Sequence, residues 1–349
     1  MNLNPKFPLY LPGVKNSSNN NISIIGADIS EDTTLLGYYI SNNGSIETRI
    51  HKRYNTSDYA DFSEILTQFI KEENLENVKR LGISVPGPVL NGKSNPIRLK
   101  WALDVQDFKR DFGFEQVDLL NDQEASAYGI ALLQDSDIEA IHTSGHLEKG
   151  NVAFIAPGTG LGEAGYFYDG EYLRPFATEG GHSEFSPRTM VEVEFYQFLN
   201  NIYGIVSWEN VISKTGLFNI YRFLRDVKRH PEPEWLANRL ANGNFTEEIF
   251  RAAMDRDVLI CKITLDTFIE FLARESNNLT LKLKATGGLL IGGEIANTIR
   301  KYIDKDKFYE KFKISDKMED MLKNIPIYVI NSETSSVNGV ALYTAYFKD

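Results

Sequence analysis

Apolar and polar positions in the first 140 residues follow two different periods. Runs of β-branched and apolar residues predict strands, and apolar residues three and four apart predict helices with one buried face. Strands are expected at residues 22–29, 35–40, 46–54, 81–85 and 117–120, and helices at 58–71, 104–112 and 123–133. A turn at Asn42-Asn43-Gly44 joins the second and third strands. This half therefore has the order βββ-α-β-α-β-α.

The pattern restarts after a polar connector at residues 135–150. Strands are expected at 152–156, 163–168, 171–173, 289–291 and 327–330, and helices at 191–203, 217–227, 245–253, 258–274, 295–302 and 337–347. Both halves open with a strand meander and then alternate helices with strands, which indicates an internal duplication. The expected fold class is α/β, with two lobes and a cleft between them where a small ligand binds.

The length of 349 residues fits two domains. We expect a flexible polar N-terminal arm at 1–21, a small N-terminal α/β lobe at 22–140 and a large C-terminal α/β lobe at 141–349 with a helical insertion. The arm lacks the continuous apolar stretch of a secretory signal, and no apolar run reaches the roughly 20 residues that span a bilayer. These features predict a cytoplasmic protein.

The charge balance restricts the partners. The chain carries 37 Lys and Arg against 48 Asp and Glu, a net charge of −11, which repels polyphosphates and anionic surfaces. We therefore expect neither a nucleic acid nor a membrane as partner. Cys261 is the only cysteine, which excludes disulfides and cysteine-rich zinc sites, and its amphipathic surroundings predict a buried apolar role.

A glycine-rich turn, Gly158-Thr159-Gly160-Leu161-Gly162, joins two predicted strands. Its glycines allow positive φ and leave backbone N–H groups open to a phosphate, although an ordinary hairpin explains it equally well. A dinucleotide-binding fingerprint would open a helix, and this turn runs into a strand instead. The sequence therefore does not favour a dehydrogenase.

The segment Gly87 to Ser94 matches the phosphate-loop pattern GxxxxGK[ST] and follows a strand. Its context differs, because a helix must begin at the lysine, whereas Asn95-Pro96 favours an extended chain. We interpret the match as accidental and Lys93 as a surface residue.

Two aspartates follow predicted strands. Asn121-Asp122 ends one strand and opens a helix, so Asp122 lies at the carboxyl edge of a sheet, where ligands of α/β sheets bind. From these residues alone, a helix-capping role is the favoured explanation of Asp122. Asp28 ends the first strand and is either a ligand of metal-bound water or a turn residue.

Two further motifs point to a small polar ligand. Glu179-Gly180-Gly181-His182 places an acid and an imidazole around two glycines, which suits hydrogen bonds to vicinal hydroxyls better than a metal site. Its alternative is a turn closed by a Glu–His contact. In residues 287–294 a strand lies between two glycine pairs, which indicates a bulge or the close approach of a flat group such as a nucleotide base.

Taken in order, these strings resemble the bacterial glucokinase family of the hexokinase and actin-like ATPase superfamily. The matching strings are Gly26-Ala27-Asp28, Leu120-Asn121-Asp122 with Ala125, Pro157 to Gly162, Glu179 to His182 with Phe185-Ser186-Pro187, and Gly287 to Gly293. The resemblance covers residues 22–347 and implies two ribonuclease-H-like lobes that close on sugar and ATP. It also implies phosphorylation of glucose at its 6-hydroxyl, the first step of glycolysis.

The resemblance implies a role for each matching residue. Asp122 would be the catalytic base. The sugar ligands would be Asn95, Asn121, Glu179, His182 and Glu209. Gly158, Thr159, Gly160 and Gly162 would hold the ATP phosphates, Gly288, Gly292 and Gly293 would face the adenosine, and Asp28 would lie near the water shell of Mg²⁺. The sequence leaves open whether the protein forms a homodimer.

One departure from the family leaves alternatives. The family's first loop reads Asp-x-Gly-Gly-Thr, whereas this chain has Asp28-Ile29-Ser30-Glu31-Asp32-Thr33, which brings a negative charge towards the phosphates. A non-catalytic sugar sensor and a kinase for another hexose or an amino sugar are the alternatives. The related repressor–kinase group carries a cysteine-rich zinc motif that this chain lacks, which favours the plain glucokinase branch.

Overall fold

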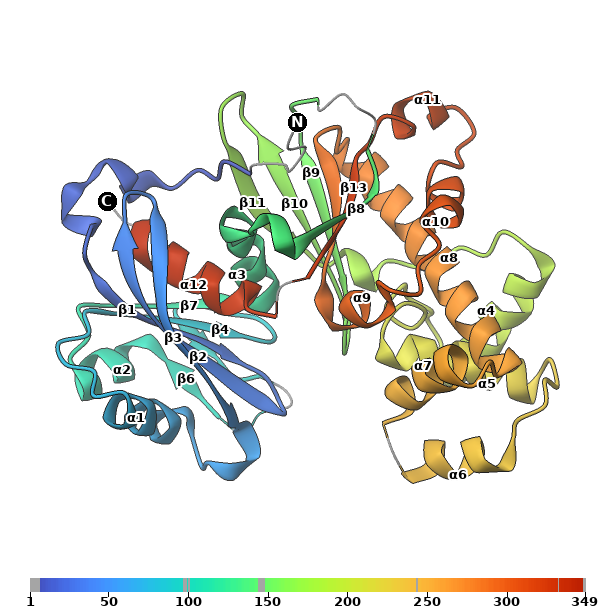
Figure 1. Ribbon diagram of the computed structural model, residues 1–349, viewed down its shortest axis with the longest axis horizontal. Helices are drawn as coiled ribbons and strands as arrows, with labels where there is room; N and C mark the ends of the chain where they lie inside the picture. Colours follow the sequence, from blue (N-terminus) through green and yellow to red (C-terminus); the bar gives the residue numbers. More distant parts are fainter. Residues whose placement is uncertain are drawn as a thin grey trace. The chain divides into compact units, whose positions relative to one another are not determined.

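The computed structural model describes residues 7–96, 99, 101–143, 148–242, 244–331 and 333–347. The chain forms two compact units (Figure 1). The first contains the residues up to Asp135, Glu171–Ala177 and the segment after Asn331, and the second contains Ser136–Gly170 and Thr178–Asn331. The C-terminal segment therefore belongs to the first unit, whereas the sequence analysis assigned all residues after 140 to one C-terminal lobe.

The first unit is built on a sheet of strand order β3-β2-β1-β4-β7. Its strands are β1 (Ser23–Ile29), β2 (Thr33–Asn42), β3 (Ser45–Asn55), β4 (Arg80–Val85) and β7 (Gln116–Asn121). β1, β4 and β7 are parallel, and β2 is antiparallel to β1 and β3. The expected meander and both later strands are confirmed. A short pair, β5 (Lys93–Ser94) and β6 (Leu103–Asp104), lies outside this sheet.

Helices cover both faces of this sheet (Figure 1). The helices are α1 (Phe62–Glu72), α2 (Val105–Phe112), α3 (Asp122–Gly129) and α12 (Ser335–Tyr346). Phe62 and Phe108 anchor α1 and α2 on one face, while α12 packs against Tyr39 on the other face and contacts α3. Apolar burial of this kind attaches the C-terminal helix to the first unit, a long-range pairing that local periodicity does not reveal.

The N-terminal arm is a correction to the sequence analysis, which expected residues 1–21 to be flexible. Residues 1–6 lie outside the described part, but Phe7 and Leu9 are buried and the backbones of Tyr10 and Leu173 are hydrogen-bonded at 3.0 Å. Asn19 is also buried, and its Oδ1 accepts a hydrogen bond from Arg80 Nη2 at 2.7 Å. These contacts offset the polar composition that suggested a loose arm.

The second sheet has the order β11-β10-β9-β12-β13-β8. Its strands are β8 (Ile138–His142), β9 (Val152–Pro157), β10 (Leu161–Tyr168), β11 (Leu173–Thr178), β12 (Gly288–Ile291) and β13 (Ile327–Ile330). β9, β12 and β13 are parallel and β10 is antiparallel to β9. The order β10-β9-β12-β13 repeats β2-β1-β4-β7, which confirms the internal duplication.

β8 was missed, because residues 135–150 were expected to form a polar connector. Its five residues are all half-buried and pair antiparallel with β13 at the edge of the sheet. An edge strand with neither face fully buried lacks the alternation that identifies a strand. Residues 144–147 of the connector lie outside the described residues.

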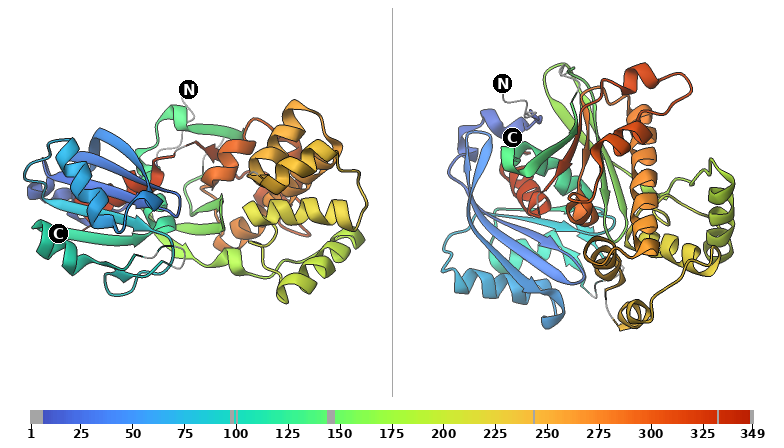
Figure 2. Two further views of the ribbon diagram at one scale, coloured as in Figure 1. Left: turned by 90° about the horizontal axis from the view of Figure 1, so that it is seen from below. Right: turned by 45° about the vertical axis from the view of Figure 1, so that its right-hand side comes forward.

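Most of the helices belong to the second unit. They are α4 (Met190–Tyr203), α5 (Lys214–Asp226), α6 (Glu234–Asn242), α7 (Phe245–Asp255), α8 (Leu259–Leu283), α9 (Gly293–Ile299), α10 (Lys305–Phe312) and α11 (Glu319–Leu322). The long α8 lies beside β9 and β12 and packs against α5, α7 and α10 (Figure 2). Cys261 on α8 is buried as predicted, and burial raises the pKa of its thiol to about 12.

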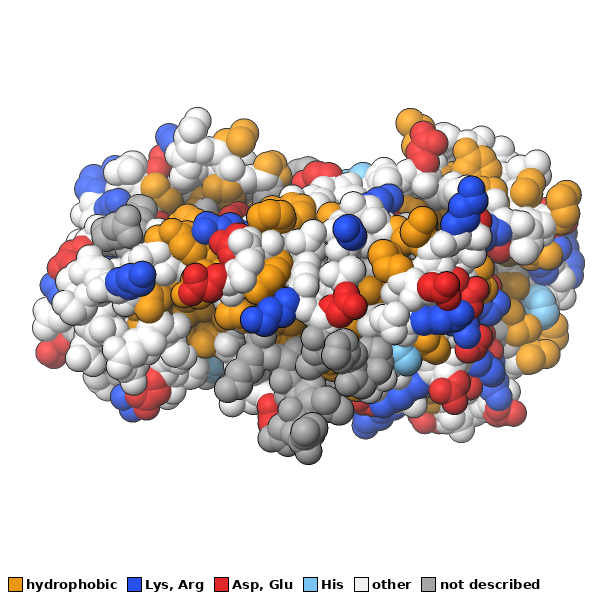
Figure 3. Space-filling model, turned by 90° about the horizontal axis from the view of Figure 1, so that it is seen from above, with side chains coloured by type: hydrophobic (Ala, Val, Ile, Leu, Met, Phe, Trp, Pro, Cys, Tyr) orange, Lys and Arg blue, Asp and Glu red, His pale blue; other side chains and the backbone are white. Residues whose placement is uncertain are grey.

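Two surface properties bear on partners. Among the described residues, no helix has both the length and the apolar character needed to cross a membrane. On the face shown in Figure 3, Lys and Arg side chains are interspersed with Asp and Glu.

Candidate active site

The carboxyl ends of β1, β4 and β7 form one edge of the first sheet. Asp28 is aligned with Ser84 across β1 and β4, and Val85 is aligned with Asn121 across β4 and β7. Because parallel strands end at the same edge, the structure brings Asp28, Asn121 and Asp122 together.

Asp28 is a half-buried carboxylate with a fixed orientation. Its Oδ1 accepts a hydrogen bond from Ser84 Oγ at 2.9 Å. Burial raises the pKa of Asp28 to about 6, against the lowering effect of the Ser84 bond, and the charge of Asp122 raises it further. Two carboxylates that repel each other at one sheet edge form a place where a cation or a proton is favoured.

The first turn of α3 shows how Asp122 is held. Asn121, not Asp122, is the N-cap, and its Oδ1 accepts from the backbone N–H of Gln123 at 2.9 Å. Asp122 is the first helical residue, and its Oδ1 accepts from the same N–H at 2.9 Å. Burial raises the pKa of Asp122. Because Asn121 accepts from the same N–H, the cap does not depend on Asp122 alone.

The loop before Asn95 is tied to this edge. Asn121 Nδ2 donates to the Gly87 carbonyl at 3.0 Å, and Ser94 Oγ donates to the Pro88 carbonyl at 3.0 Å. Asn95 itself is exposed. Lys93 lies in β5 rather than at a helix start, and its ammonium pairs with Asp104 at 2.8 Å. The phosphate-loop match is thus accidental, as predicted.

The corresponding edge of the second unit carries the glycine-rich turn. Residues 158–160 connect β9 and β10, and Thr159 is exposed at the tip. None of Gly158, Gly160 and Gly162 has a positive φ, so the expected reason for these glycines is wrong. Gly160 is needed for space instead, because a Cβ there would lie 2.5 Å from Glu209 Oε2. Helix α5 begins beside the turn, where Lys214 N donates to the Gly158 carbonyl at 2.8 Å.

Glu209 connects this turn with the motif from Glu179 to His182. Its Oε2 accepts from Leu161 N at 3.1 Å, and its own backbone N–H donates to the Gly181 carbonyl at 2.9 Å. Glu179 and His182 are both exposed, and His182 N donates to the Glu179 carbonyl at 3.1 Å. The second unit therefore gathers two carboxylates and an imidazole beside a backbone turn, a set suited to sugar hydroxyls.

The glycine pairs around β12 have two different environments. Gly293 has φ +86°, and a Cβ there would lie 2.6 Å from the Pro157 carbonyl, next to the turn at Gly158. A Cβ on Gly292 would lie 2.7 Å from the Phe154 ring. The chain's own β9 thus makes the close approach that the sequence analysis assigned to a nucleotide base.

Gly288 does not lie with Gly292 and Gly293, although the resemblance placed all three at the adenosine. It is buried at the opposite end of β12, aligned with Val152 at the start of β9, and has φ +136°. Its positive φ explains the glycine without a ligand. The structure therefore places Gly292 and Gly293 beside the turn at Gly158 and separates Gly288 from them.

Several contacts at these edges were missed from the sequence. Ser84 orients Asp28, and the ammonium of Lys214 pairs with Glu294 at 2.7 Å beside Gly293. Arg274 is buried and pairs with Glu192 at 2.6 Å. Its guanidinium also donates to the Ser186 carbonyl at 2.7 Å, behind the motif that ends at His182. Ser84 could have been noticed in the sequence, because it lies one residue before the end of the predicted strand β4. The ion pairs of Lys214 and Arg274 join residues that are far apart in the chain, so no local pattern indicates them.

Asp28 fits a hydrated magnesium ion by its ligand type. Mg²⁺ prefers carboxylate oxygens, keeps several waters and takes only one or two carboxylates from a protein. Within the described residues, no group of three or more His, Cys, Asp or Glu side chains could enclose a metal. The donor set therefore suits an ion held mainly by water and phosphate oxygens.

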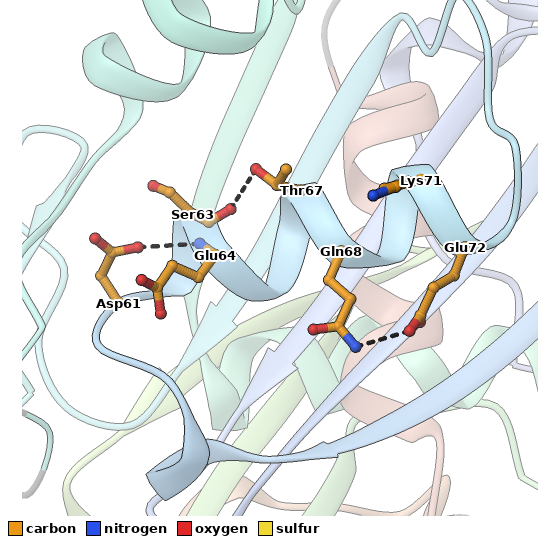
Figure 4. A pocket seen from close by; sticks show the side chains of 7 residues that line it. All are labelled: Asp61, Ser63, Glu64, Thr67, Gln68, Lys71 and Glu72. Carbon is orange, nitrogen blue, oxygen red and sulfur yellow. Dashed lines mark hydrogen bonds between the residues drawn. The ribbon is translucent and has the colours of Figure 1, made fainter.

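A pocket on α1 is unrelated to these edges (Figure 4). Its lining side chains all come from α1 and its N-cap Asp61. Internal bonds already satisfy several of them, including Gln68 to Glu72 at 2.7 Å and Glu64 N to Asp61 at 3.1 Å. None of the predicted site residues lies there.

Comparison with known proteins identifies the family. A family model described as Glucokinase matches residues 25–346. The chain belongs to the glucokinase family. A glucokinase of Nostoc punctiforme is 29% identical over 336 residues, covering 92% of this chain and 98% of that one.

Two solved structures share the fold. A glucokinase from an Antarctic psychrotroph has a TM-score of 0.79 at 22% identity, covering 92% of this chain and 98% of its own. A ROK family glucokinase from Streptomyces griseus, in complex with glucose and AMPPNP, has a TM-score of 0.60 at 17% identity, covering 91% and 98%. The expected actin-like ATPase fold is thus confirmed.

Proposed function

We propose that this protein transfers the γ-phosphoryl group of ATP to the 6-hydroxyl of glucose. The observation that carries the proposal is the position of Asp122, a half-buried carboxylate at the carboxyl edge of β7 that the helix cap does not require. Membership of the glucokinase family and a relative solved with glucose and AMPPNP support the substrate pair. The reaction would take place in the cytoplasm, where ATP is available.

Asp122 would act as the catalytic base. Its carboxylate accepts the proton of the attacking hydroxyl as the oxygen bonds to phosphorus, and ADP leaves with the electron pair of the broken bond. Its raised pKa brings its basicity closer to that required near neutral pH. Asn121 positions it, because the Asn121 side chain bonds both to the α3 backbone and to Gly87.

The sugar hydroxyls would bind to Glu179, His182 and Glu209, with Asn95 and Asn121 supplying amides. Exposed Glu179 and His182 side chains can turn towards a ligand, whereas Glu209 is held through its Oε2. A carboxylate accepts from two neighbouring hydroxyls, which favours a sugar over a monohydroxy alcohol. A shift of these groups would alter the preferred hexose.

The turn at Gly158, Thr159 and Gly160 would receive the phosphates of ATP. Gly158 has no atom within 4 Å of a Cβ position, so its surroundings are open, and Thr159 offers an exposed hydroxyl. The start of α5 next to the turn favours negative charge. Gly292 and Gly293 let the chain after β12 pack closely against Phe154 and Pro157 of β9 beside this turn. Gly162, in β10, would belong to the same phosphate-binding backbone. When bound, Mg²⁺ supplies charge neutralisation on the phosphate oxygens, and Asp28 would hold its water shell.

A coupled assay for ADP release tests the proposal. Purified protein with ATP and Mg²⁺ should release ADP when glucose is added, at a higher kcat/KM than with other hexoses or amino sugars. Higher kcat/KM with another sugar would reassign the substrate. Glucose binding measured by calorimetry without any ADP release would instead identify the non-catalytic sensor.

A further inference from the structure

A buried carboxyl lies directly behind the motif from Glu179 to His182. Glu163, on β10, is only 1% exposed. In the part of the chain that the structure describes, no donor group is paired with either carboxyl oxygen of Glu163, and its side-chain neighbour is the carboxyl of Glu275. Two buried carboxyls side by side are costly unless one of them is protonated and donates a hydrogen bond to the other.

Glu163 touches the motif through both its backbone and its side chain. Its carbonyl accepts from Thr178 Oγ1 at 3.0 Å, and Thr178 Oγ1 accepts from Gly180 N at 3.1 Å. Its Oε2 fills the position that a Cβ on Gly180 would occupy. Gly180 has no positive φ, so this carboxyl, and not the backbone conformation, excludes a side chain there.

We propose that Glu163 is a positioning residue for sugar binding, whose buried carboxyl, packed against Gly180, sets the place of Glu179 and His182. The inference rests on the proposed function and adds a residue that does not touch the substrate. It predicts that the affinity for glucose, and not the chemical step, depends on the charge and shape of Glu163.

The surroundings of Glu163 favour the neutral form. Burial raises the pKa of Glu163 to about 8, and the carboxyl of Glu275 on α8 raises it further. Lys282, also on α8, opposes this effect but is bound to Glu275 at 3.4 Å. The neighbouring strand β9 contributes no titratable side chain. Below about pH 8 the Glu163 carboxyl is therefore mostly uncharged, and above it Glu163 gains a negative charge beside Glu275.

Ionisation should loosen the motif, because an unpaired buried charge is far more costly than a neutral carboxyl. If the ionised form binds sugar poorly, the KM for glucose should rise about tenfold between pH 7 and pH 9. The kcat at saturating glucose should change little over this range, since Glu163 does not touch the reacting groups.

The first experiment compares pH profiles of wild type and Glu163→Gln. The carboxamide matches the neutral carboxyl in shape and does not ionise, so the alkaline rise in glucose KM should disappear while the KM at pH 7 stays within about twofold. Glu270→Gln, at a half-buried position on α8 whose carboxylate pairs with Lys311 at 2.8 Å, is the matched control and should keep the wild-type profile. Parallel profiles for wild type and Glu163→Gln would overturn the inference.

The second experiment tests the contact with Gly180. Gly180→Ala alone should raise the glucose KM, since its methyl group collides with Glu163, and Glu163→Ala alone should raise it because support is lost. The double variant should bind glucose better than Gly180→Ala, because the methyl group enters the vacated space. If the effects of the two single substitutions on the glucose KM simply combine in the double variant, the contact between Glu163 and Gly180 is contradicted. If the alanine variants fold poorly, the pH profile of Glu163→Gln still tests the inference.

The experiments distinguish a failure of this inference from a failure of the proposed function. Calorimetric glucose binding without nucleotide reports on the positioning role and needs no turnover. A wild type that binds glucose with a Glu163-dependent pH profile but releases no ADP would overturn the kinase and support the positioning role. A wild type that binds no glucose at any pH would overturn both.

Discussion

The two sheet edges have the same topology and different chemistry. In each, a hairpin turn leaves the first parallel strand: residues 30–32 between β1 and β2, and residues 158–160 between β9 and β10. The first turn is closed by Ser30, whose Oγ donates to the Thr33 carbonyl at 2.7 Å, and it carries Glu31 and Asp32. The second is made of Gly158, Thr159 and Gly160.

Under the proposed function, this difference gives the two edges different parts of the reaction. The first edge concentrates carboxylates, with Asp28 and Asp122 each at a raised pKa, and suits proton transfer and a cation. The second edge offers glycine backbone and a helix start, and suits phosphate oxygens. Topology sets where ligands approach, whereas the residues at the strand ends set which chemistry occurs there.

The largest expected effect comes from removing the base at the first edge. Asp122→Asn keeps the acceptor oxygen for Gln123 N but cannot take a proton, so kcat should fall about a hundredfold or more. Glucose binding, followed by calorimetry, should survive. Asp104→Asn, which keeps the cap of α2, is the matched control and should leave kcat unchanged. A kcat of Asp122→Asn within a few-fold of wild type would remove Asp122 from the chemistry.

The second prediction compares two glycines of the second edge. Gly160→Ala should displace Glu209, whose Oε2 would lie 2.5 Å from the new Cβ, and should raise KM for both glucose and ATP about tenfold. Gly158→Ala meets no atom within 4 Å and should change either KM less than Gly160→Ala does. Steady-state titrations of both substrates check this, and the reverse order would mean that Gly158 alone contacts the phosphates.

Sequence reasoning worked best where a local pattern carries the structure. The five strands of the first sheet are bounded by turn residues and apolar runs, and Asp122 follows one of them directly, so both the strand and its edge were predictable. Asp28 was predictable for the same reason.

It worked least where distant segments meet. The packing of α12 on the first sheet, the docking of the N-terminal arm and the edge strand β8 all depend on long-range contacts. Gly288 and Gly292 look alike in sequence, and only the strand register shows that they lie at opposite ends of β12. The sequence around Glu163 does not indicate its role, because its spatial neighbours Gly180 and Glu275 are far from it in the chain.

The third prediction concerns the charge on the first turn. Glu31 is exposed, and a carboxylate near the triphosphate would oppose ATP, so Glu31→Gln should lower the KM for ATP a few-fold at low ionic strength and less at high salt. Ser30 is left intact because its Oγ closes the turn. Glu47→Gln, an exposed change on β3, is the control. A higher KM for ATP in Glu31→Gln would mean that Glu31 assists the cation.

The smallest effect is expected at the accidental phosphate-loop match. Lys93 is exposed and pairs with Asp104 outside the main sheet, so Lys93→Ala should leave the KM for ATP within about twofold of wild type. An ATP titration of this variant beside Gly160→Ala sharpens the comparison. Should Lys93→Ala have the larger effect, the phosphates would belong to the first unit.

The most direct measurement of the central claim is ADP release by the wild type with glucose and with 6-deoxyglucose. Both sugars present the hydroxyls that Glu179, His182 and Glu209 would bind, but only glucose has the 6-hydroxyl that Asp122 would deprotonate. The account predicts rapid ADP release with glucose, none above background with 6-deoxyglucose, and competitive inhibition of the first reaction by the second sugar. Equal ADP release with both sugars, or none with glucose although it binds, would contradict it.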